Sequence, residues 1–302
     1  MRLFKKHKRS LSVVIVFFNM QREAKRTLWS LTVDYQFGVS VEDYEVIVLD
    51  NASTEPLDGD WVCGLQENFS YHYLGSEYPS PCVALNTGVE KATGEHVICM
   101  VDGARILSPG ILLSMKRGFN AVPNAYIYTL GFHLGHIPQH KSVHDGYCQK
   151  VEDQLLKEVP WMEDGYYLFD ISSPAASARE GFLGITSESN CFGLKKRTFE
   201  KLEGYNEKFV SRGGGMCNLE VHNRLVGCSD LEPMLLLGEG TFHQFHGGVA
   251  TNTERLAPIL TAFSREYSEV VGEEYKPTAY VPLYFGKIHP KSTRFIGSLG
   301  PG

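Results

Sequence analysis

Apolar runs rich in β-branched residues alternate with helical patterns over the first 130 residues, and this alternation restricts the fold more than any other feature. Residues 11–18 (LSVVIVFF) are continuously apolar, as expected of a parallel strand buried on both faces. Residues 21–35 then carry apolar side chains at helical spacing. This order predicts βαβ units, a parallel sheet and the α/β fold class.

The same two patterns recur along the chain. Further strands are predicted over residues 44–49, 69–74, 96–101 and 125–130. Further helices are predicted over residues 81–92, 109–119, 149–159 and 218–225, and a strand followed by a helix over residues 190–209. Ser108 is predicted to be the N-cap of the helix that starts at Pro109. Loops are expected over residues 172–179 and 238–252, and the tail from residue 277 shows little periodicity.

Polar side chains follow three of the predicted strands. Asn19 comes after the first strand, Asp50 ends the second, and Asp102 ends the strand at 96–101. Ligands of open parallel sheets bind at the carboxyl ends of the strands, so these side chains predict a nucleotide or sugar-phosphate site. The alternative for each aspartate is a role in capping a turn.

The charge balance excludes one class of partner. The chain has 302 residues, with 29 Lys and Arg against 35 Asp and Glu, which gives a net charge of −6. This sign disfavours broad electrostatic binding to nucleic acid, although small anionic ligands remain open. None of the seven cysteines forms a CxxC pair, so we expect free thiols in a reducing compartment, the cytoplasm.

The first ten residues form a basic leader. It contains five basic side chains, namely Arg2, Lys5, Lys6, Lys8 and Arg9. The apolar run that follows is eight residues long and has no small-residue cleavage site after it, so we expect a buried first strand rather than a signal peptide. The leader is either a solvated terminus or a peripheral contact with an anionic membrane surface.

Several segments resemble family 2 glycosyltransferases. In the first half they are LSVVIVFFN, EVIVLDNAST and ALNTGVEKATGEHVICMVDGARILSPGIL, and in the second half CFGLKKRTFEKLEGYNEKF and RGGGMCNLEVHNRL. The resemblance covers about residues 10–250. It implies a GT-A fold, a mostly parallel sheet flanked by helices. It also implies a nucleotide half over about residues 10–105 and an acceptor half over about 106–260, followed by a C-terminal extension over 261–302.

The activity implied by the resemblance is sugar transfer. The donor would be a nucleotide-diphosphate sugar such as a UDP- or GDP-sugar, and the acceptor a saccharide. Transfer would be of the hexosyltransferase type with inversion, in surface-polysaccharide or other glycan biosynthesis. A catalytically degenerate module that only binds a nucleotide sugar or glycan is the alternative.

The resemblance also implies roles for single residues. Phe18 and Asn19 would border the base and ribose, and Asp50 would hydrogen-bond the nucleobase. Asp102 would be the first acid of the family's D-x-D turn, near the ribose and the metal. The nucleotide-binding set also includes Asn86, from the helix before that turn, and Arg105, directly after it.

Two departures from the family pattern affect the chemistry. Ala104 stands where the second acid of the turn would ligate a metal, and Asn218 stands where a helix would supply an acid. The absence of the metal-ligating acid at Ala104 leaves three interpretations. Arg105 supplies fixed positive charge, or His243 and His246 complete an Mn²⁺ or Mg²⁺ site with Asp102, or transfer has been lost.

The second loss leaves the catalytic base to be found. Glu220 is the nearest carboxylate and the predicted base. Its alternative role is an ion pair with Arg224, four residues further along the same helix. Asp164 and Glu188 are further candidates. The glycine run at 213–215 predicts backbone close to a ligand, or else a flexible loop.

Overall fold

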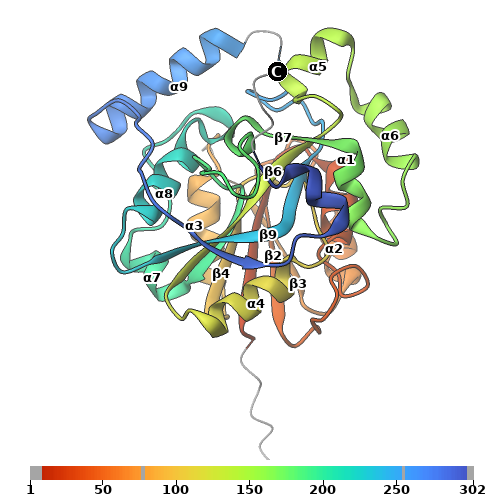
Figure 1. The fold of residues 1–302 in the computed structure, drawn as a ribbon, viewed down its shortest axis with the longest axis horizontal. Helices are drawn as coiled ribbons and strands as arrows, with labels where there is room; N and C mark the ends of the chain where they lie inside the picture. The colour runs from red at the N-terminus through yellow and green to blue at the C-terminus, as the bar shows by residue number, and fades with distance from the viewer. Residues whose placement is uncertain (1–8, 76–78, 254–255, 298–302) are drawn as a thin grey trace, which may run out of the picture.

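The chain is described by a computed structural model that covers residues 9–75, 79–253 and 256–297. Its centre is a mixed sheet of ten strands (Figure 1). Eight of them follow the order β10-β9-β6-β8-β4-β1-β2-β3, and the other two, β5 and β7, pair with β9 and β6. The strands are β1 (Leu11–Phe17), β2 (Tyr44–Asn51), β3 (Phe69–Leu74), β4 (His96–Met100), β5 (Arg105–Leu107), β6 (Ala125–Leu134), β7 (Ser172–Pro174), β8 (Cys191–Lys195), β9 (Glu232–His243) and β10 (Leu283–Gly286).

Helices and short 3₁₀ turns connect the strands. The α-helices are α1 (Gln21–Trp29), α2 (Gly59–Leu65), α3 (Cys82–Lys91), α4 (Ile111–Ala121), α5 (Gln139–Ser142), α6 (Gln149–Lys157), α7 (Lys196–Lys201), α8 (Cys217–Val226) and α9 (Leu256–Val271). The 3₁₀ turns are η1 (Val143–Asp145), η2 (Gly165–Ile171), η3 (Ala176–Ala178), η4 (Arg212–Gly214) and η5 (Pro290–Phe295). Among the described residues, no helix combines the length and the apolar character that crossing a membrane requires.

The N-terminal half follows the predicted βαβ pattern. β1 lies between β2 and β4 and is parallel to both, and β3 extends the parallel part at the edge. Every residue of β1, β2 and β4 is buried, which explains their continuous apolar runs. Because these strands are parallel, their carboxyl ends lie at one edge of the sheet. The predicted α/β class and GT-A-like architecture are confirmed.

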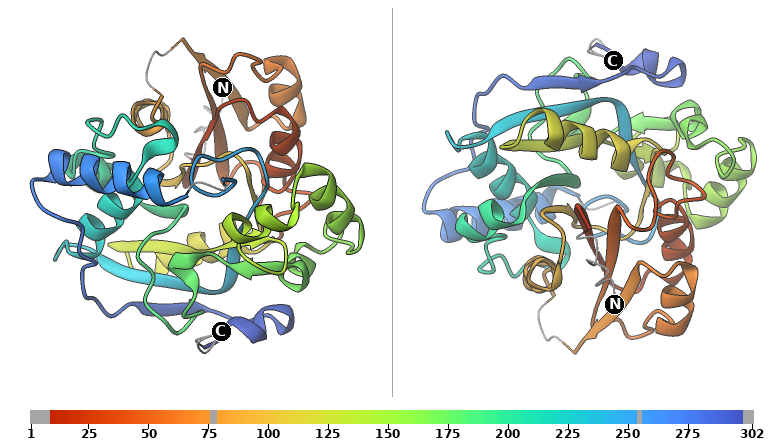
Figure 2. Two further views of the ribbon diagram at one scale, coloured as in Figure 1. Left: turned by 90° about the horizontal axis from the view of Figure 1, so that it is seen from above. Right: turned by 90° about the horizontal axis from the view of Figure 1, so that it is seen from below.

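The second half makes the sheet mixed. β8 is antiparallel to both of its neighbours, β4 and β6, whereas β6, β9 and β10 run parallel to one another. In Figure 2 the first strands lie on one side of the molecule, and β9 and β10 on the opposite side.

Two expectations for the second half were wrong. Residues 238–243 continue the long strand β9 instead of forming a loop, and the expected loop at 172–179 contains β7 and η3. Residue 260, the predicted start of the C-terminal extension, lies within α9, and β10 of that segment pairs with β9.

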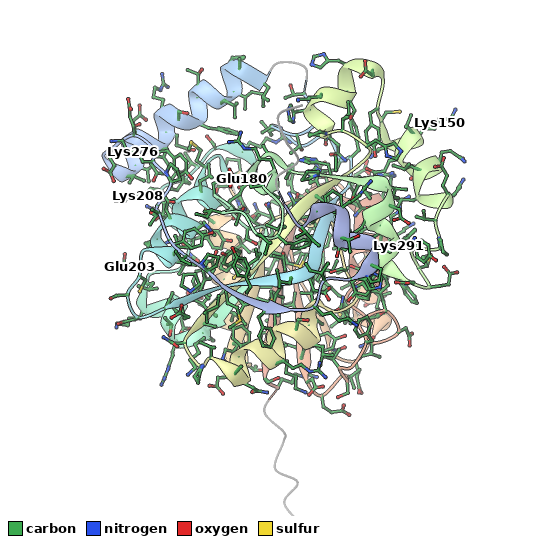
Figure 3. All side chains as sticks on the ribbon, in the orientation of Figure 1. Lys150, Glu180, Glu203, Lys208, Lys276 and Lys291 are labelled. Carbon is green, nitrogen blue, oxygen red and sulfur yellow. The ribbon has the colours of Figure 1, made fainter. Side chains whose placement is uncertain are left out.

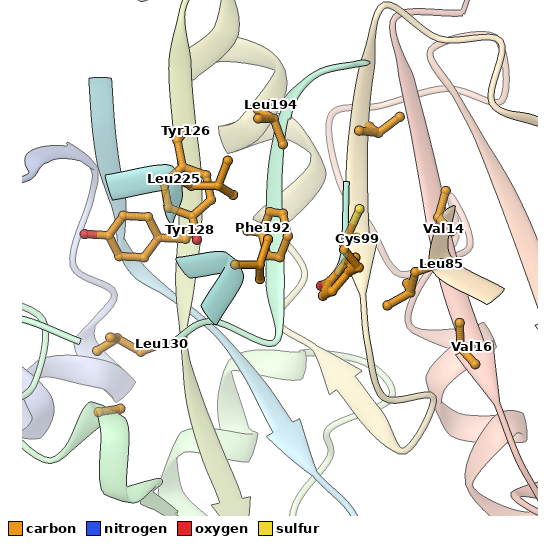
Figure 4. Packing of buried hydrophobic residues seen from close by; sticks show 14 of the residues in the cluster. Val14, Val16, Leu85, Cys99, Tyr126, Tyr128, Leu130, Phe192, Leu194 and Leu225 are labelled. Atoms are coloured by element: carbon orange, nitrogen blue, oxygen red, sulfur yellow. The ribbon is translucent and has the colours of Figure 1, made fainter. Parts of the chain in front are cut away.

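The core has two parts, one on each face of the sheet. Alternate residues of β1 enter different parts: Val14 and Val16 pack with α3 and α8, whereas Val13 and Ile15 pack with α1 and α4. Figure 4 shows the first of these clusters, with Leu85 of α3 beside the two valines of β1. Charged side chains such as Lys150 and Lys208 lie at the periphery (Figure 3).

The N-terminus of α4 differs from the sequence prediction. The helix starts at Ile111 with Gly110 at the N-cap, and Ser108 does not cap it. The Ser108 hydroxyl instead donates to the carboxylate of Glu239 on β9. Residues 1–8 of the basic leader lie outside the described residues, and Arg9 forms an ion pair with Glu45.

Gly88 offers a test of the packing between α3 and the sheet. A Cβ at Gly88 would lie 2.4 Å from Val14 Cγ1 and 2.6 Å from Leu49 Cδ1, so Gly88→Ala should destabilise the protein by about 1–3 kcal/mol through overpacking. Gly64→Ala in α2 is the matched control, because no atom lies within 4 Å of its Cβ position. Urea denaturation measures both. Equal stability of the two variants would contradict this packing.

Candidate active site

The turn after β4 is closed by its own aspartate. Asp102 Oδ1 accepts a hydrogen bond of 2.9 Å from the backbone N–H of Ala104. The carbonyl of Ala104 accepts from Gln244 N–H at 2.8 Å, and Arg105 pairs with His243 in the β5–β9 ladder. The D-G-A turn is therefore fixed against the end of β9, although about 140 residues separate the two in sequence.

Three potential metal ligands meet at this point. His243 Nε2 lies 3.2 Å from Asp102 Oδ2, and His246 Nε2 lies 3.8 Å from Asp102 Oδ1. The two histidine Nε2 atoms are 3.1 Å apart. The ligand atoms of all three residues lie within 4.8 Å of one another. The structure thus brings together the three residues that the sequence suggested as a metal site.

Gln139 at the start of α5 sets the tautomer of His243. Its Nε2 donates to the His243 carbonyl at 3.0 Å, so its Oε1 must be the acceptor for His243 Nδ1 at 2.7 Å. Asn252 Nδ2 also donates to this oxygen, at 3.0 Å. His243 therefore carries its proton on Nδ1, and the lone pair of Nε2 faces Asp102 and His246. No pattern in the sequence pointed to Gln139.

Burial and charge put these groups in the states that metal binding needs. Burial lowers the pKa of His243 to about 4, so its imidazole is neutral near pH 7. Burial alone would raise the pKa of Asp102, but this pKa is held well below its usual range by the charge that His243 and His246 carry when protonated and by Arg105. Near pH 7 the positive charge comes from Arg105, whose Nε lies 3.3 Å from Asp102 Oδ2. An ionised carboxylate and a neutral imidazole are the forms that ligate cations.

The ends of β1 and β2 are tied together beside this cluster. The Asn19 N–H donates to Ser53 Oγ at 2.8 Å, and Asn19 Oδ1 accepts from Thr54 N–H at 2.9 Å. Asp50 is buried, and its two oxygens accept from Ser53 N–H and Leu57 N–H at 2.9 and 3.0 Å. Asp50 thus caps the turn, and both of its oxygens already have protein donors.

Arg212 reaches the same edge from the second half of the chain. Its guanidinium lies 5.1 Å above the ring of Phe18. Gly213 and Gly214 follow with positive φ, and α9 supports the approach to this loop because Glu266 Oε1 accepts from Ser211 N–H at 2.7 Å. The glycine run was noticed in the sequence, whereas Arg212 was missed although it directly precedes that run.

The cluster of Asp102, His243 and His246 is separate from two hollows on the surface. One, of about 470 Å³, lies between α1 and α6, and the other, of about 420 Å³, lies beside η2 and η5. Neither hollow is lined by Asp102, His243 or His246.

The N-terminal part of the chain matches one protein family. Residues 12–127 match the family described as glycosyl transferase family 2. This part of the chain, less than half of its length, is similar in sequence to that family. The match covers β1 to the start of β6, including the turns after β1, β2 and β4. No curated protein sequence matched the chain.

Solved structures agree on the glycosyltransferase fold. S. aureus TarS 1-349 in complex with UDP-GlcNAc matches with a TM-score of 0.53 and 12% identity, over 86% of this chain and 67% of that chain. The same fragment in complex with UDP matches with a TM-score of 0.50 and 12% identity, over 86% and 72%. The longer TarS structure also gives 0.50 and 12%, over 86% of this chain, which spans 40% of that chain. At this identity the likeness shows the fold.

Two residues expected to act in the glycosyltransferase site have structural partners instead. Asn86 Nδ2 donates to the Tyr205 carbonyl and Asn86 Oδ1 accepts from Tyr205 N–H, both at 2.9 Å, which fastens α3 to the turn before Glu207. Both oxygens of Glu220 accept from Arg224, at 2.8 and 3.1 Å. These contacts give both residues a structural role, whereas the nucleotide-binding role of Asn86 and the catalytic role of Glu220 remain predictions.

The other contacts of Arg224 indicate the structural role of Glu220. The guanidinium of Arg224 also donates to the carbonyls of Leu202 and Gly204, so the ion pair joins α8 to the end of α7. Asn218, at the family's acid position, donates from Nδ2 to Asn190 Oδ1 at 2.9 Å. An amide in this position cannot accept the proton of an attacking hydroxyl.

The Glu220–Arg224 pair is testable by stability. Glu220→Gln should lower the free energy of unfolding by about 1–2 kcal/mol, because Arg224 loses its part-buried anionic partner. Glu200→Gln is the control: Glu200 forms a more exposed i,i+4 pair with Lys196 and should change stability by about 0.5 kcal/mol or less. Chemical denaturation compares them. Unchanged stability of Glu220→Gln together with lost sugar transfer would restore Glu220 as the base.

Proposed function

We propose that this chain transfers a sugar from a UDP-sugar to a saccharide acceptor, with a divalent cation held by Asp102, His243 and His246. The observation that carries the proposal is this three-residue cluster, located at the carboxyl edge of a family 2 glycosyltransferase sheet. The choice of UDP rests on TarS, which has the same fold and whose structures contain UDP-GlcNAc and UDP.

The three metal ligands Asp102, His243 and His246 make up for the acid that is missing at Ala104. Two imidazole nitrogens and one carboxylate favour a transition metal such as Mn²⁺ over Mg²⁺, which prefers oxygen ligands. When bound, the cation would offset the negative charge that develops on the departing nucleotide diphosphate. His243 is held ready for this role by Gln139, because the Nδ1 hydrogen bond fixes its ring.

The nucleoside is proposed to lie at the edge formed by the turns after β1 and β2. Phe18 supplies an aromatic face there, and Arg212 supplies positive charge above it. Asn19 and Asp50 contribute by holding the two turns, since their side-chain oxygens accept from backbone N–H groups. In this arrangement the phosphates extend from Phe18 toward Asp102.

The proton acceptor for the attacking hydroxyl is proposed to be Glu188. Burial raises the pKa of its carboxyl although Arg105 lies within Coulombic reach, and a base whose pKa is raised toward the working pH is efficient. Asp164, the other alternative to Glu220, caps Tyr166 N–H at 3.0 Å. Direct displacement with one such base would invert the anomeric carbon.

The proposed setting is surface-polysaccharide or other glycan biosynthesis in the cytoplasm, with the free thiols as support for a reducing compartment. Ala104 and Asn218 favour a second candidate, a module that binds a nucleotide sugar without transferring it. Release of UDP from a bound UDP-sugar in the presence of saccharides separates the two functions. Tight donor binding without any release under these conditions would favour the binding module.

Metal dependence of nucleotide binding tests the proposed function. Mn²⁺ should strengthen UDP binding by about 10-fold or more, Mg²⁺ should do so less, and His246→Ala should remove most of the Mn²⁺ effect because the site loses a ligand. Isothermal titration with and without EDTA measures this.

His72→Ala is the control for the histidine change. His72 lies on the edge strand β3, at the opposite end of the sheet order from β9. This variant should keep the wild-type response to Mn²⁺. Equal UDP affinity in Mn²⁺ and in EDTA would contradict the proposed metal site.

A further inference from the structure

Phe245 lies between the proposed metal ligands His243 and His246, and two helices hold its backbone. Its N–H donates to Glu152 Oε2 of α6 at 2.7 Å, and its carbonyl accepts from Arg22 Nη1 of α1 at 3.3 Å. Glu152 and Arg22 also bind each other, with Arg22 Nη2 3.1 Å from Glu152 Oε1. This ion pair therefore fixes both backbone groups of the residue between the two histidines.

Glu152 also acts on the ring of His243 through Gln139. Glu152 Oε2 accepts from Gln139 Nε2 at 3.4 Å and from the Tyr147 hydroxyl at 3.3 Å. Gln139 Oε1, at the other side of the same amide, accepts from His243 Nδ1 at 2.7 Å. Since an ionised carboxylate only accepts hydrogen bonds, Glu152 favours the orientation of the Gln139 amide in which the oxygen faces His243.

Asp153, the next residue of α6, shares the arginine partners of Glu152 but not its other contacts. Asp153 pairs with Arg22 at 2.6 Å and with Arg26, and its side chain is 41% exposed, whereas that of Glu152 is fully buried. Within the described ranges, Asp153 has no hydrogen bond to residues 243–246 or to Gln139. Because burying a carboxylate costs more than an ion pair usually offsets, Asp153 would be enough to fix the two arginines. What Glu152 adds is contact with the histidine segment.

We infer that Glu152 is a positioning residue of the site, which keeps the rings of His243 and His246 turned toward Asp102. The inference rests on the proposed function for the role of the cation, whereas the placement of the two rings is a property of the chain itself. A ligand set has to hold its geometry within about 0.5 Å, and residues behind the ligands strongly affect metal affinity. Glu152 acts from behind both histidines, through the backbone between them and through the amide of Gln139.

Glu152→Gln tests this role at pH 8, above the pKa of Glu152, which burial raises to about 7. The nitrogen of the introduced amide cannot accept a hydrogen bond, so either the Phe245 N–H or Arg22 loses its partner. With UDP present, titration calorimetry should show Mn²⁺ binding weakened by about 10-fold or more. The affinity for UDP in EDTA should change by less than about 3-fold, because the nucleoside edge is not altered.

Asp153→Asn is the matched control. It also removes a negative charge beside Arg22, but it leaves the contacts with the histidine segment, so Mn²⁺ affinity should change by less than about 3-fold. Glu152→Asp is a milder second variant for the case that Glu152→Gln does not fold. It keeps the charge beside Arg22, and its shorter side chain withdraws the carboxylate from Phe245, so Mn²⁺ binding should weaken by about 3-fold or more.

Imidazole ¹⁵N NMR spectra of the metal-free protein give a second readout. The wild-type protein should show His243 protonated at Nδ1 in a single set of signals. Both Glu152 variants should shift or split the signals of His243 and His246, and Asp153→Asn should leave them unchanged.

The other outcomes have distinct meanings. If Glu152→Gln and Asp153→Asn weaken Mn²⁺ binding equally, the ion pairs act on the fold as a whole and the inference is wrong. Wild-type Mn²⁺ affinity together with wild-type imidazole spectra in the Glu152 variants also overturns it. If the wild-type protein binds UDP without any effect of Mn²⁺, the proposed metal site is wrong, and the imidazole spectra alone then decide whether Glu152 places the rings.

Discussion

The pairing of β5 with β9 is the interaction on which the proposed site depends. β5 begins at Arg105, directly after the Asp102–Ala104 turn, and its antiparallel ladder places Arg105 opposite His243. The bond from Gln244 N–H to the Ala104 carbonyl extends this contact into the turn itself. These contacts bring Asp102, from the part of the chain that matches the family model, beside the two imidazoles of His243 and His246.

In the proposed metal site, two histidines take the place of the acid that is absent at Ala104. Ala104 contributes no ligand, and the cluster draws instead on His243 and His246, of which His243 is neutral near pH 7 because it is buried. Gln139 fixes the ring through Nδ1, and Asn252 supports Gln139 in turn. In the proposed site, imidazole ligation shifts the preference among cations from Mg²⁺ toward Mn²⁺.

The sequence predicted the features that depend on local pattern. The buried runs of β1, β2 and β4 were found because both of their faces are covered, and their parallel order placed Asn19, Asp50 and Asp102 at one edge. The strand character of residues 238–243 was missed because glycines interrupt its apolar pattern. Partnerships such as Asn86 with Tyr205 and Gln139 with His243 join segments more than 100 residues apart and leave no mark in local spacing. The i,i+4 spacing of Glu220 and Arg224 correctly predicted their ion pair.

Anomalous diffraction from crystals grown with Mn²⁺ and UDP would locate the cation directly. We expect an anomalous peak within coordination distance of Asp102, His243 Nε2 and His246 Nε2, with the diphosphate of UDP completing the coordination. The uracil should lie beside Phe18. UDP bound at this edge without an anomalous peak at the three side chains would contradict the account, and so would Mn²⁺ bound elsewhere on the protein.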